Sequence, residues 1–288
     1  MVKGTVPACT GQRAAATARI QKITTEKILE CIDAGIENNC RLTIDTLSSY
    51  SGYSRRHLQR LFQDRTGMCV GEYIRRRRLT RAALLLRFSL RSYQDIALSV
   101  GYDSQQSMNR EFKRQTGVTP GQYRERPEWL LAPLTGRVCP TFDIPEPEVV
   151  CLEEGCVTGE EMCFYGSVAI EPDTPSFTAH LDRIFAHTGG ELWMVAQTVP
   201  AGRRDYHYQV TCVLGGPGQE GKAEGRYAAG RYLKVSFETT RETHVARTHY
   251  IYQTLLPGKG AARSPGTEVL VFLYRAGKVM CTLFIPVM

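Results

Sequence analysis

Two short segments of the sequence carry polar side chains that could hydrogen-bond to the edges of DNA bases. Both sets recur at helical spacing, and their members are Arg55, Arg56, Gln59 and Arg60 in the first segment and Gln105, Gln106, Asn109 and Arg110 in the second. In the major groove arginine pairs with guanine through two hydrogen bonds, and glutamine or asparagine pairs with adenine in the same way. The alternative is a solvated helix surface, on which such residues are common.

An internal repeat favours base recognition over that alternative. At an offset of fifty residues the same residue type recurs at several positions, and the first members of these pairs are Ser54, Arg60, Phe62, Thr66, Gly67, Gly71 and Tyr73. Their counterparts run from Ser104 to Tyr123. Because the glycines and the aromatic residues keep the same spacing in both copies, the sequence contains a duplicated structural unit.

Each copy has the pattern of a helix, a tight turn and a second helix. Gly52 and Gly101 end the first helices, because glycine tolerates the left-handed backbone of a sharp turn. Ser54 is a preferred N-cap for the helix that follows, and Leu58 and Phe62 lie on one apolar stripe of it. The pattern predicts two helix-turn-helix units, in which the second helix enters the major groove.

A helix from about Val70 to Phe88 is expected between the two copies. At the α-helical rise it is roughly 28 Å long, and it could set the recognition helices about one DNA turn, ~34 Å, apart. Basic residues of this helix and of the second recognition helix could contact phosphates without reading sequence. The expected phosphate contacts are Arg75, Arg76, Arg78, Lys113 and Arg114. As the alternative, part of the arginine run is only a solvated face.

Positive charge is concentrated in the same part of the chain. The formal net charge is +7 over 288 residues. Residues 20–126 contain 19 basic against 11 acidic residues, a balance of +8, and the rest of the chain has a balance of −1. This distribution favours a polyanionic partner, double-stranded DNA, for the N-terminal part. No run of ~18 apolar residues occurs, so we expect no transmembrane helix. A membrane surface could also attract the basic part, but no amphipathic anchor or lipidation motif supports it, so we expect no membrane partner.

These features resemble the AraC/XylS family of transcriptional regulators, in particular its MarA/SoxS/Rob branch. The resemblance covers about Thr24 to Arg126 and is carried by the segments Gly52–Phe62 and Gly101–Gln106, then Phe112-Lys113, Pro120 and Tyr123. It implies a seven-helix bipartite domain that binds an asymmetric site as a monomer and activates transcription with RNA polymerase.

The same resemblance assigns the base contacts. They fall on Arg56, Gln59 and Arg60 in the first recognition helix, and on Gln105, Gln106, Asn109 and Arg110 in the second. Two positions depart from the pattern of close relatives: Arg56 stands where tryptophan is found, and Asn109 where threonine is usual. These departures bear on the operator sequence that is read.

Five prolines between residues 127 and 147 predict a linker, because each removes a backbone donor and resists helix. Beyond it, segments rich in Val, Tyr, Phe and Thr predict strands over Met162–Ile170, Tyr206–Leu214, Arg231–Thr239, Glu268–Tyr274 and Val279–Val287. Helices are expected over Ser176–His187 and near Thr240–Thr254. The predicted fold class is an all-α bipartite double helix-turn-helix domain followed by an α+β domain with an antiparallel sheet.

We expect four parts in the chain: a disordered leader over 1–19, the DNA-binding domain over 20–126, the linker over 127–147 and a second domain over 148–288. The strand Gly230–Phe237 and the terminal Leu283–Val287 resemble, more weakly, a GyrI-like effector-binding domain. That resemblance implies two β-α-β-β repeats around a cleft for an amphipathic small molecule, often an organic cation.

Aromatic residues and one acid are the expected lining of this cleft: Trp193, Tyr206, Tyr208, Tyr232 and Glu268. For the aromatic residues, ordinary core or sheet packing is the alternative. A second acid common in the family just before the terminal Ile-Pro is replaced by Cys281 and Thr282, which weakens the case for a cationic ligand.

Catalytic and metal-binding patterns are absent from the sequence. The ten cysteines include no C-x-x-C pair, and the six histidines fit no zinc, hydrolase or metalloprotease motif. We therefore expect no enzyme activity, no cofactor and no metal. Free thiols are expected, with a redox sensor at Cys151, Cys156 and Cys163 as the alternative.

The leading hypothesis is a cytoplasmic, nucleoid-associated transcriptional regulator. It would activate promoters of the stress, efflux or virulence type and carry a ligand- or protein-sensing second domain. The alternatives are a nucleoid-type DNA binder with little sequence preference, whose affinity depends on phosphates alone, and a small-molecule enzyme in the second domain.

Overall fold

The computed structural model describes residues 9–40, 42–138, 142–168, 175–187, 190–201, 208–217, 223–260, 262–275 and 277–288. These residues form two compact units. The first contains the chain up to Arg78 together with Arg137 and Val138; the second contains Leu79–Gly136 and the described residues from Phe142 onward. Helix α4 (Val70–Phe88) begins in the first unit and ends in the second.

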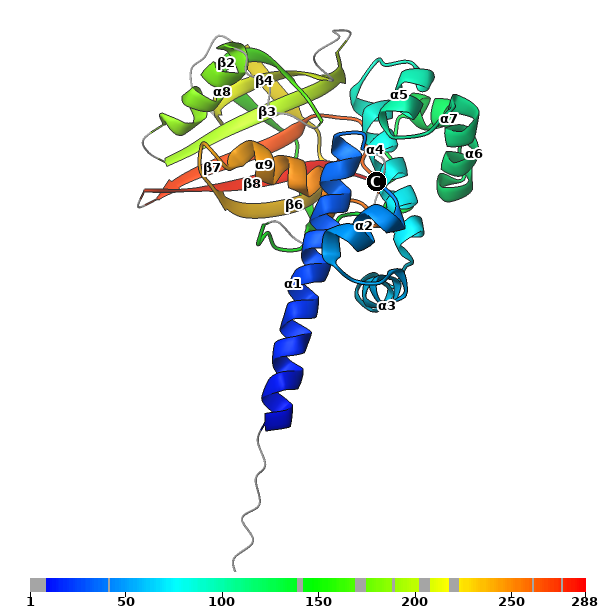
Figure 1. Ribbon diagram of the computed structural model, residues 1–288. Coiled ribbons are helices and arrows are strands. Elements are labelled where there is room, and N and C mark those ends of the chain that lie inside the picture. Colours follow the sequence, from blue (N-terminus) through cyan, green and yellow to red (C-terminus); the bar gives the residue numbers. More distant parts are fainter. Residues whose placement is uncertain are drawn as a thin grey trace, which may run out of the picture. The chain divides into compact units, whose positions relative to one another are not determined.

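The first unit contains three helices and the beginning of α4 (Figure 1): α1 (Cys9–Glu37), α2 (Ile44–Ser51) and α3 (Arg55–Thr66). Thr43 and Thr46 form a capping box at the start of α2, and Gly52 ends it in the left-handed region at φ 71°. The core consists of apolar side chains from all four helices, among them Ile28, Leu29, Leu47, Leu58, Phe62 and Tyr73. Thr43 and Gly52 therefore mark the two ends of α2, and the tight turn to α3 begins at Gly52.

The second unit repeats this arrangement with three further helices: α5 (Tyr93–Ser99), α6 (Gln105–Thr116) and α7 (Pro120–Glu125). Ser92 caps α5 by accepting a hydrogen bond from the backbone N–H of Asp95. Gly117 ends α6 at φ 80°, as Gly67 ends α3 at φ 71°. The predicted double helix-turn-helix is confirmed.

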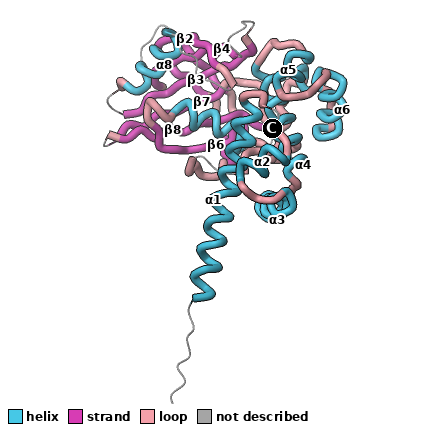
Figure 2. The backbone as a smooth tube through the Cα atoms, in the orientation of Figure 1, coloured by secondary structure: helices cyan, strands magenta, loops and turns pink. Residues whose placement is uncertain are grey.

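An antiparallel sheet of eight strands, magenta in Figure 2, follows in the second unit. Its strands are β1 (Glu148–Leu152), β2 (Gly155–Gly166), β3 (Gly190–Pro200), β4 (Tyr208–Gly216), β5 (Ala223–Tyr227), β6 (Gly230–Thr239), β7 (Glu268–Arg275) and β8 (Lys278–Val287). Their order across the sheet is β1-β6-β8-β7-β3-β4-β2-β5.

The connectivity of the sheet is that of two β-α-β-β repeats. The first repeat is β2, α8 (Pro175–Phe185), β3 and β4, and the second is β6, α9 (His244–Tyr250), β7 and β8. The repeats meet where β3 pairs with β7, near the middle of the sheet. Helix α9 continues as a π-helical turn over Ile251–Leu255. The predicted α+β class with an antiparallel sheet is confirmed.

The second helix-turn-helix shares one hydrophobic core with the sheet. Met108 and Phe112 of α6 belong to the same buried cluster as Leu233 and Phe272 of the sheet. The segment predicted as a linker also contributes, since Trp129, Leu131 and Leu134 are buried. Prolines exclude helix from this segment, but the apolar residues between them pack into the core.

Two expected boundaries therefore differ from the structure. The compact units divide at Arg78 and Leu79 within α4, and the proline-rich segment is not the boundary. Most of its described residues belong to the second unit, where Trp129, Leu131 and Leu134 are buried, while Arg137 and Val138 belong to the first. Helix α1 begins at Cys9, inside the segment expected as a disordered leader; its alanine run has high helix propensity. Strands β1, β3 and β5 were not predicted. Within the described ranges, no helix has the length and apolar character needed to cross a membrane.

Candidate nucleic-acid interface and ligand cavity

Helix α3 separates a buried face from a polar face. Ser54 caps it by accepting a hydrogen bond from the backbone N–H of His57 at 3.4 Å. Leu58 and Phe62 are fully buried, while Arg56 and Arg60 are exposed. The apolar stripe therefore fixes the rotation of the helix, and that rotation sends the two arginines into solvent.

The four predicted base-reading side chains of α3 differ in their partners. Arg55 forms an ion pair with Asp45 of α2. The half-buried Gln59 accepts a hydrogen bond from the backbone N–H of Val70 at 3.4 Å through its Oε1 atom. The side-chain NH₂ of Gln59 is thus the group that could donate a hydrogen bond to a base. Arg60 contacts Nδ1 of His57 at 3.3 Å, and Arg56 makes no hydrogen bond or ion pair within the described residues.

Helix α6 is built in the same way. Ser104 caps it by accepting from the N–H of Ser107 at 3.2 Å, and Met108 and Phe112 are buried. Among the predicted base-reading residues, Gln106 and Arg110 are exposed. Gln105 and Asn109 are half-buried. The Oδ1 atom of Asn109 is buried without a partner in the described part of the chain. Gln106 and Arg110 are therefore the most accessible of the predicted base-reading residues of α6.

The predicted phosphate-contacting residues lie on α4 and α6. Arg76 pairs with Glu72 at 2.6 Å and Arg114 pairs with Glu111 at 2.5 Å, both with exposed or half-exposed side chains. Such surface pairs contribute little free energy, so they hold the two arginine side chains only weakly. Lys113 is exposed, whereas Arg75 and Arg78 are half-buried and have partners within the chain.

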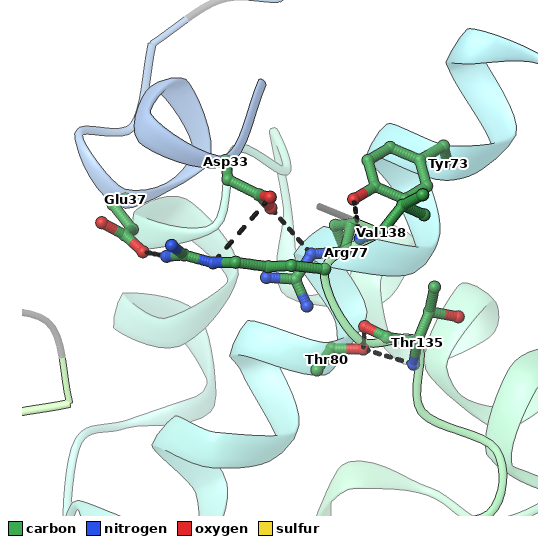
Figure 3. Close-up of polar contacts among 8 residues, drawn as sticks. Asp33, Glu37, Tyr73, Arg77, Thr80, Thr135 and Val138 are labelled. Carbon is green, nitrogen blue, oxygen red and sulfur yellow. Dashed lines mark hydrogen bonds and ion pairs between the residues drawn. The ribbon is translucent and has the colours of Figure 1, made fainter. Parts of the chain in front are cut away.

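One member of the arginine run has a structural role instead. Arg77 is 7% exposed, and its Nε atom lies 2.8 Å from Oδ1 of Asp33 on α1. Figure 3 shows this pair together with Glu37. Arg137 pairs with Glu37, and its Nε atom lies 3.8 Å from Oδ2 of Asp33. The buried charges hold the beginning of α4 and residue 137 against α1, and they thereby position α3 within the first unit.

A cavity of about 130 Å³ lies in the second unit. Side chains from α8, α9, the π-helical turn and one face of the sheet line it, together with Leu84 and Phe88 of α4. Most of the lining is apolar, and the polar members include three histidines: His180, His244 and His249. Among the described residues no group of three metal-ligating side chains is arranged to hold a metal ion.

The structure brings only some of the expected cleft residues together. Tyr208 and Glu268 line the cavity. Trp193 does not line it. Along β3 the side chains of Met194 and Ala196 face the cavity, so those of Trp193 and Val195, which alternate with them, face the opposite side of the sheet. Tyr232 is buried outside the lining, and its hydroxyl donates to the carbonyl of Ala228 at 2.8 Å. Tyr206 lies outside the described residues.

The cavity histidines are held in the neutral form. Burial lowers the pKa of His180 to about 3, with a further contribution from the neighbouring His244. Burial likewise lowers the pKa of His244 and of His249 to about 4. The Nε2 atom of His249 lies 3.3 Å from the hydroxyl of Tyr208.

Comparisons with known proteins agree with the two capped repeats. Residues 47–126 match the family model described as "Helix-turn-helix domain". The chain is 45% identical to the regulatory protein SoxS of Salmonella typhimurium over 101 residues, which are 35% of this chain and 92% of that protein. The chain belongs to the AraC/XylS family of transcriptional regulators.

Two further relatives show how far the likeness extends. The right origin-binding protein of Escherichia coli is 43% identical to this regulator over 41% of each chain, so less than half of that relative is matched. The F1 operon positive regulatory protein of Yersinia pestis is 29% identical over 93% of this chain and 89% of its own. Thus the DNA-binding part has several close relatives, and one more distant relative matches nearly the whole chain.

Sequence reasoning missed several residues that define the cavity of this AraC/XylS regulator. His180 and His244 come from α8 and α9, which are far apart in the sequence, and they carry no recognisable motif. Arg263, which pairs with Glu268 at 2.7 Å, lies in an irregular segment before β7. The alternating pattern of β3 was the one signal that could have assigned Trp193 to the opposite face.

Proposed function

We propose that this AraC/XylS regulator is a sequence-specific activator that reads two adjacent segments of one asymmetric operator with α3 and α6. The observation that carries the proposal is the duplicated, serine-capped recognition helix whose exposed side chains are Arg56 and Arg60 in one copy and Gln106 and Arg110 in the other. Arginine prefers guanine and glutamine prefers adenine in the major groove. The two operator segments should therefore differ in base composition.

Further parts of the proposal concern partners. A monomer suffices to bind such a site, because one chain carries both recognition helices. We also propose that the regulator acts with RNA polymerase, in the bacterial cytoplasm on the nucleoid, at promoters of the stress, efflux or virulence type. The name of the Yersinia relative, a positive regulator of an operon, supports activation.

The second domain is proposed to be GyrI-like and to sense a ligand in the cavity. Support comes from the two β-α-β-β repeats and from the position of Phe88, whose ring packs against Tyr208 and Trp129 at 5.6 and 5.3 Å. Because α4 carries this phenylalanine and also contributes to the first unit, a ligand that contacts Phe88 can change the DNA-binding part. It does so only to the extent that it binds the active and inactive states with different affinity.

Binding is favoured over catalysis for this cavity. Nucleophilic catalysis needs an activated Ser, Cys, Thr or Lys beside a base. Among the described residues that line the cavity there is no serine, cysteine or lysine, and its threonines are not bonded to the imidazoles. Turnover of small esters or amides by the full chain would contradict this part of the proposal.

Selection of bound duplexes from a randomised library, followed by sequencing, tests the main proposal. The wild-type chain should enrich one asymmetric motif with two conserved segments. Arg56→Ala should relax the base preference in one segment and Gln106→Ala in the other, each at a cost of about 1–3 kcal/mol on the preferred sequence.

Lys113→Ala is the matched control. Loss of a phosphate contact should weaken binding to all sequences alike and lower the slope of log affinity against log salt by about 1. If the Arg56 and Gln106 variants keep the wild-type discrimination, or if no motif is enriched, the low-specificity nucleoid binder is the better description.

A further inference from the structure

Two imidazole rings in the cavity have no hydrogen-bond partner among the described residues. His180 and His244 are 3% and 5% exposed and line the cavity from α8 and α9. The Nδ1 atom of each is buried without a partner among the described residues, and no other hydrogen bond to either ring occurs there. A buried polar atom without a partner costs free energy. The pair therefore marks a place where a bound molecule can supply the missing hydrogen-bond partner.

Two other polar side chains of the lining, Tyr252 and Gln253, are already hydrogen-bonded within the chain. The hydroxyl of Tyr252 donates to Oε1 of Glu268 at 2.5 Å, and the amide of Gln253 donates to the carbonyl of Val168 at 2.7 Å. The ring of His180 stacks on Phe164 with 4.0 Å between centroids. This stack fixes the orientation of one unpartnered imidazole, so that its nitrogens are presented in a defined direction.

The acid in the cavity is already neutralised by a cation of the same chain. Oε1 of Glu268 accepts hydrogen bonds from Nε and NH2 of Arg263 at 3.1 and 2.7 Å, and both side chains are largely buried. A cationic ligand would bring a second positive charge next to this buried guanidinium, and an anionic ligand would face the carboxylate. Breaking or overcharging a buried ion pair is costly. The lining therefore favours a ligand without net charge.

The dimensions limit the ligand as well. The cavity has about 130 Å³, similar to the ~150 Å³ apolar cavity that holds a benzene molecule. Which nitrogen of a neutral imidazole donates depends on the tautomer. A carboxamide both donates and accepts, so it satisfies either tautomer of the two rings.

We infer, building on the proposed ligand-sensing role, that the cavity binds an uncharged molecule of about one aromatic ring whose donor–acceptor group pairs with His180 and His244. The assay measures the binding of three nearly isosteric probes to the full chain by calorimetry or ligand-observed NMR. The probes are benzamide, benzamidine, which is a cation, and benzoate, which is an anion. Benzamide should bind at least about tenfold more tightly than either ion. Absence of benzamide binding, or a preference for benzamidine, overturns the inference.

Variants assign the probe to the site. His180→Phe and His244→Phe should each weaken benzamide binding by about threefold to tenfold, since each removes one hydrogen bond. Arg263→Met should shift the preference toward benzamidine, because Glu268 then lacks its counter-charge. Trp193→Phe, on the opposite face of the sheet, is the control and should change neither probe's affinity.

The outcomes separate this inference from the proposed function. The probe measurements contain no DNA, so a chain that selects an operator motif but does not bind benzamide refutes the ligand class alone. Should Arg263→Met fail to fold in a thermal-unfolding control, the comparison of the three probes on the wild-type chain still decides. Unchanged benzamide affinity in both histidine variants also refutes the assignment.

Discussion

Mild acid should destabilise the second unit through its three cavity histidines. The ordinary pKa of histidine is 6.5, and burial lowers it to about 3 for His180 and to about 4 for His244 and His249. Between pH 6.5 and about 4 the unfolded chain therefore binds protons that the folded chain does not bind. The free energy of unfolding must then fall as the pH decreases through this window.

The size of the effect follows from the width of that window. A pH of 5 lies 1.5 units below the ordinary pKa of an imidazole. At 1.36 kcal/mol per unit, each of the three histidines therefore lowers the free energy of unfolding by about 2 kcal/mol relative to neutral pH. The three groups together cost at most about 6 kcal/mol, because neighbouring imidazoles do not titrate independently. A domain with a typical stability of about 5–15 kcal/mol loses a large part of it.

Urea unfolding at pH 7 and pH 5 measures this loss. The two tryptophans, Trp129 and Trp193, both belong to the second unit, so intrinsic fluorescence reports its unfolding selectively. His180→Phe should reduce the difference between the two pH values by about 2 kcal/mol. As the control, Phe177→Leu in the same cavity should lower the stability equally at both. Equal stability of the wild-type chain at pH 7 and 5, or an unchanged difference in His180→Phe, would refute the reasoning.

Other predictions concern the scaffold of the recognition helices. Asp33→Leu removes the carboxylate that pairs with the buried guanidinium of Arg77. It should cost about 3–5 kcal/mol, most of which is recovered when Arg77→Met is added. Urea unfolding followed by circular dichroism tests the cycle, and additive single costs would contradict it. Gly117→Ala forces alanine to φ 80° and should cost about 1–2 kcal/mol. Gly71→Ala lies inside α4 with open space around its Cβ and should instead stabilise by about 0.5–1 kcal/mol. Thermal unfolding measures both glycine variants, and a stability change of the same sign in the two would argue against this account.

The DNA-binding part could be predicted from local sequence because its signals are local. Serine caps at Ser54 and Ser104, glycine stops at Gly67 and Gly117 and a stripe of buried residues each act within one or two helical turns. These signals fixed the rotation of α3 and α6, and hence which side chains face outward. Local rules were insufficient for Arg77. Its place in a run of four arginines did not reveal that it would be buried and paired with Asp33 of another helix.

The residues of the repeat by themselves determined that this protein has two helix-turn-helix units with polar recognition faces, because capping and helical periodicity depend on neighbours in the chain. Only the tertiary structure decided that the proline-rich segment is packed and that Trp193 faces away from the cavity. Likewise, only the fold brought His180 together with His244 and paired Glu268 with Arg263. Those contacts join segments that are distant in sequence, and their energies depend on burial and on the sign of neighbouring charges, neither of which a linear pattern records.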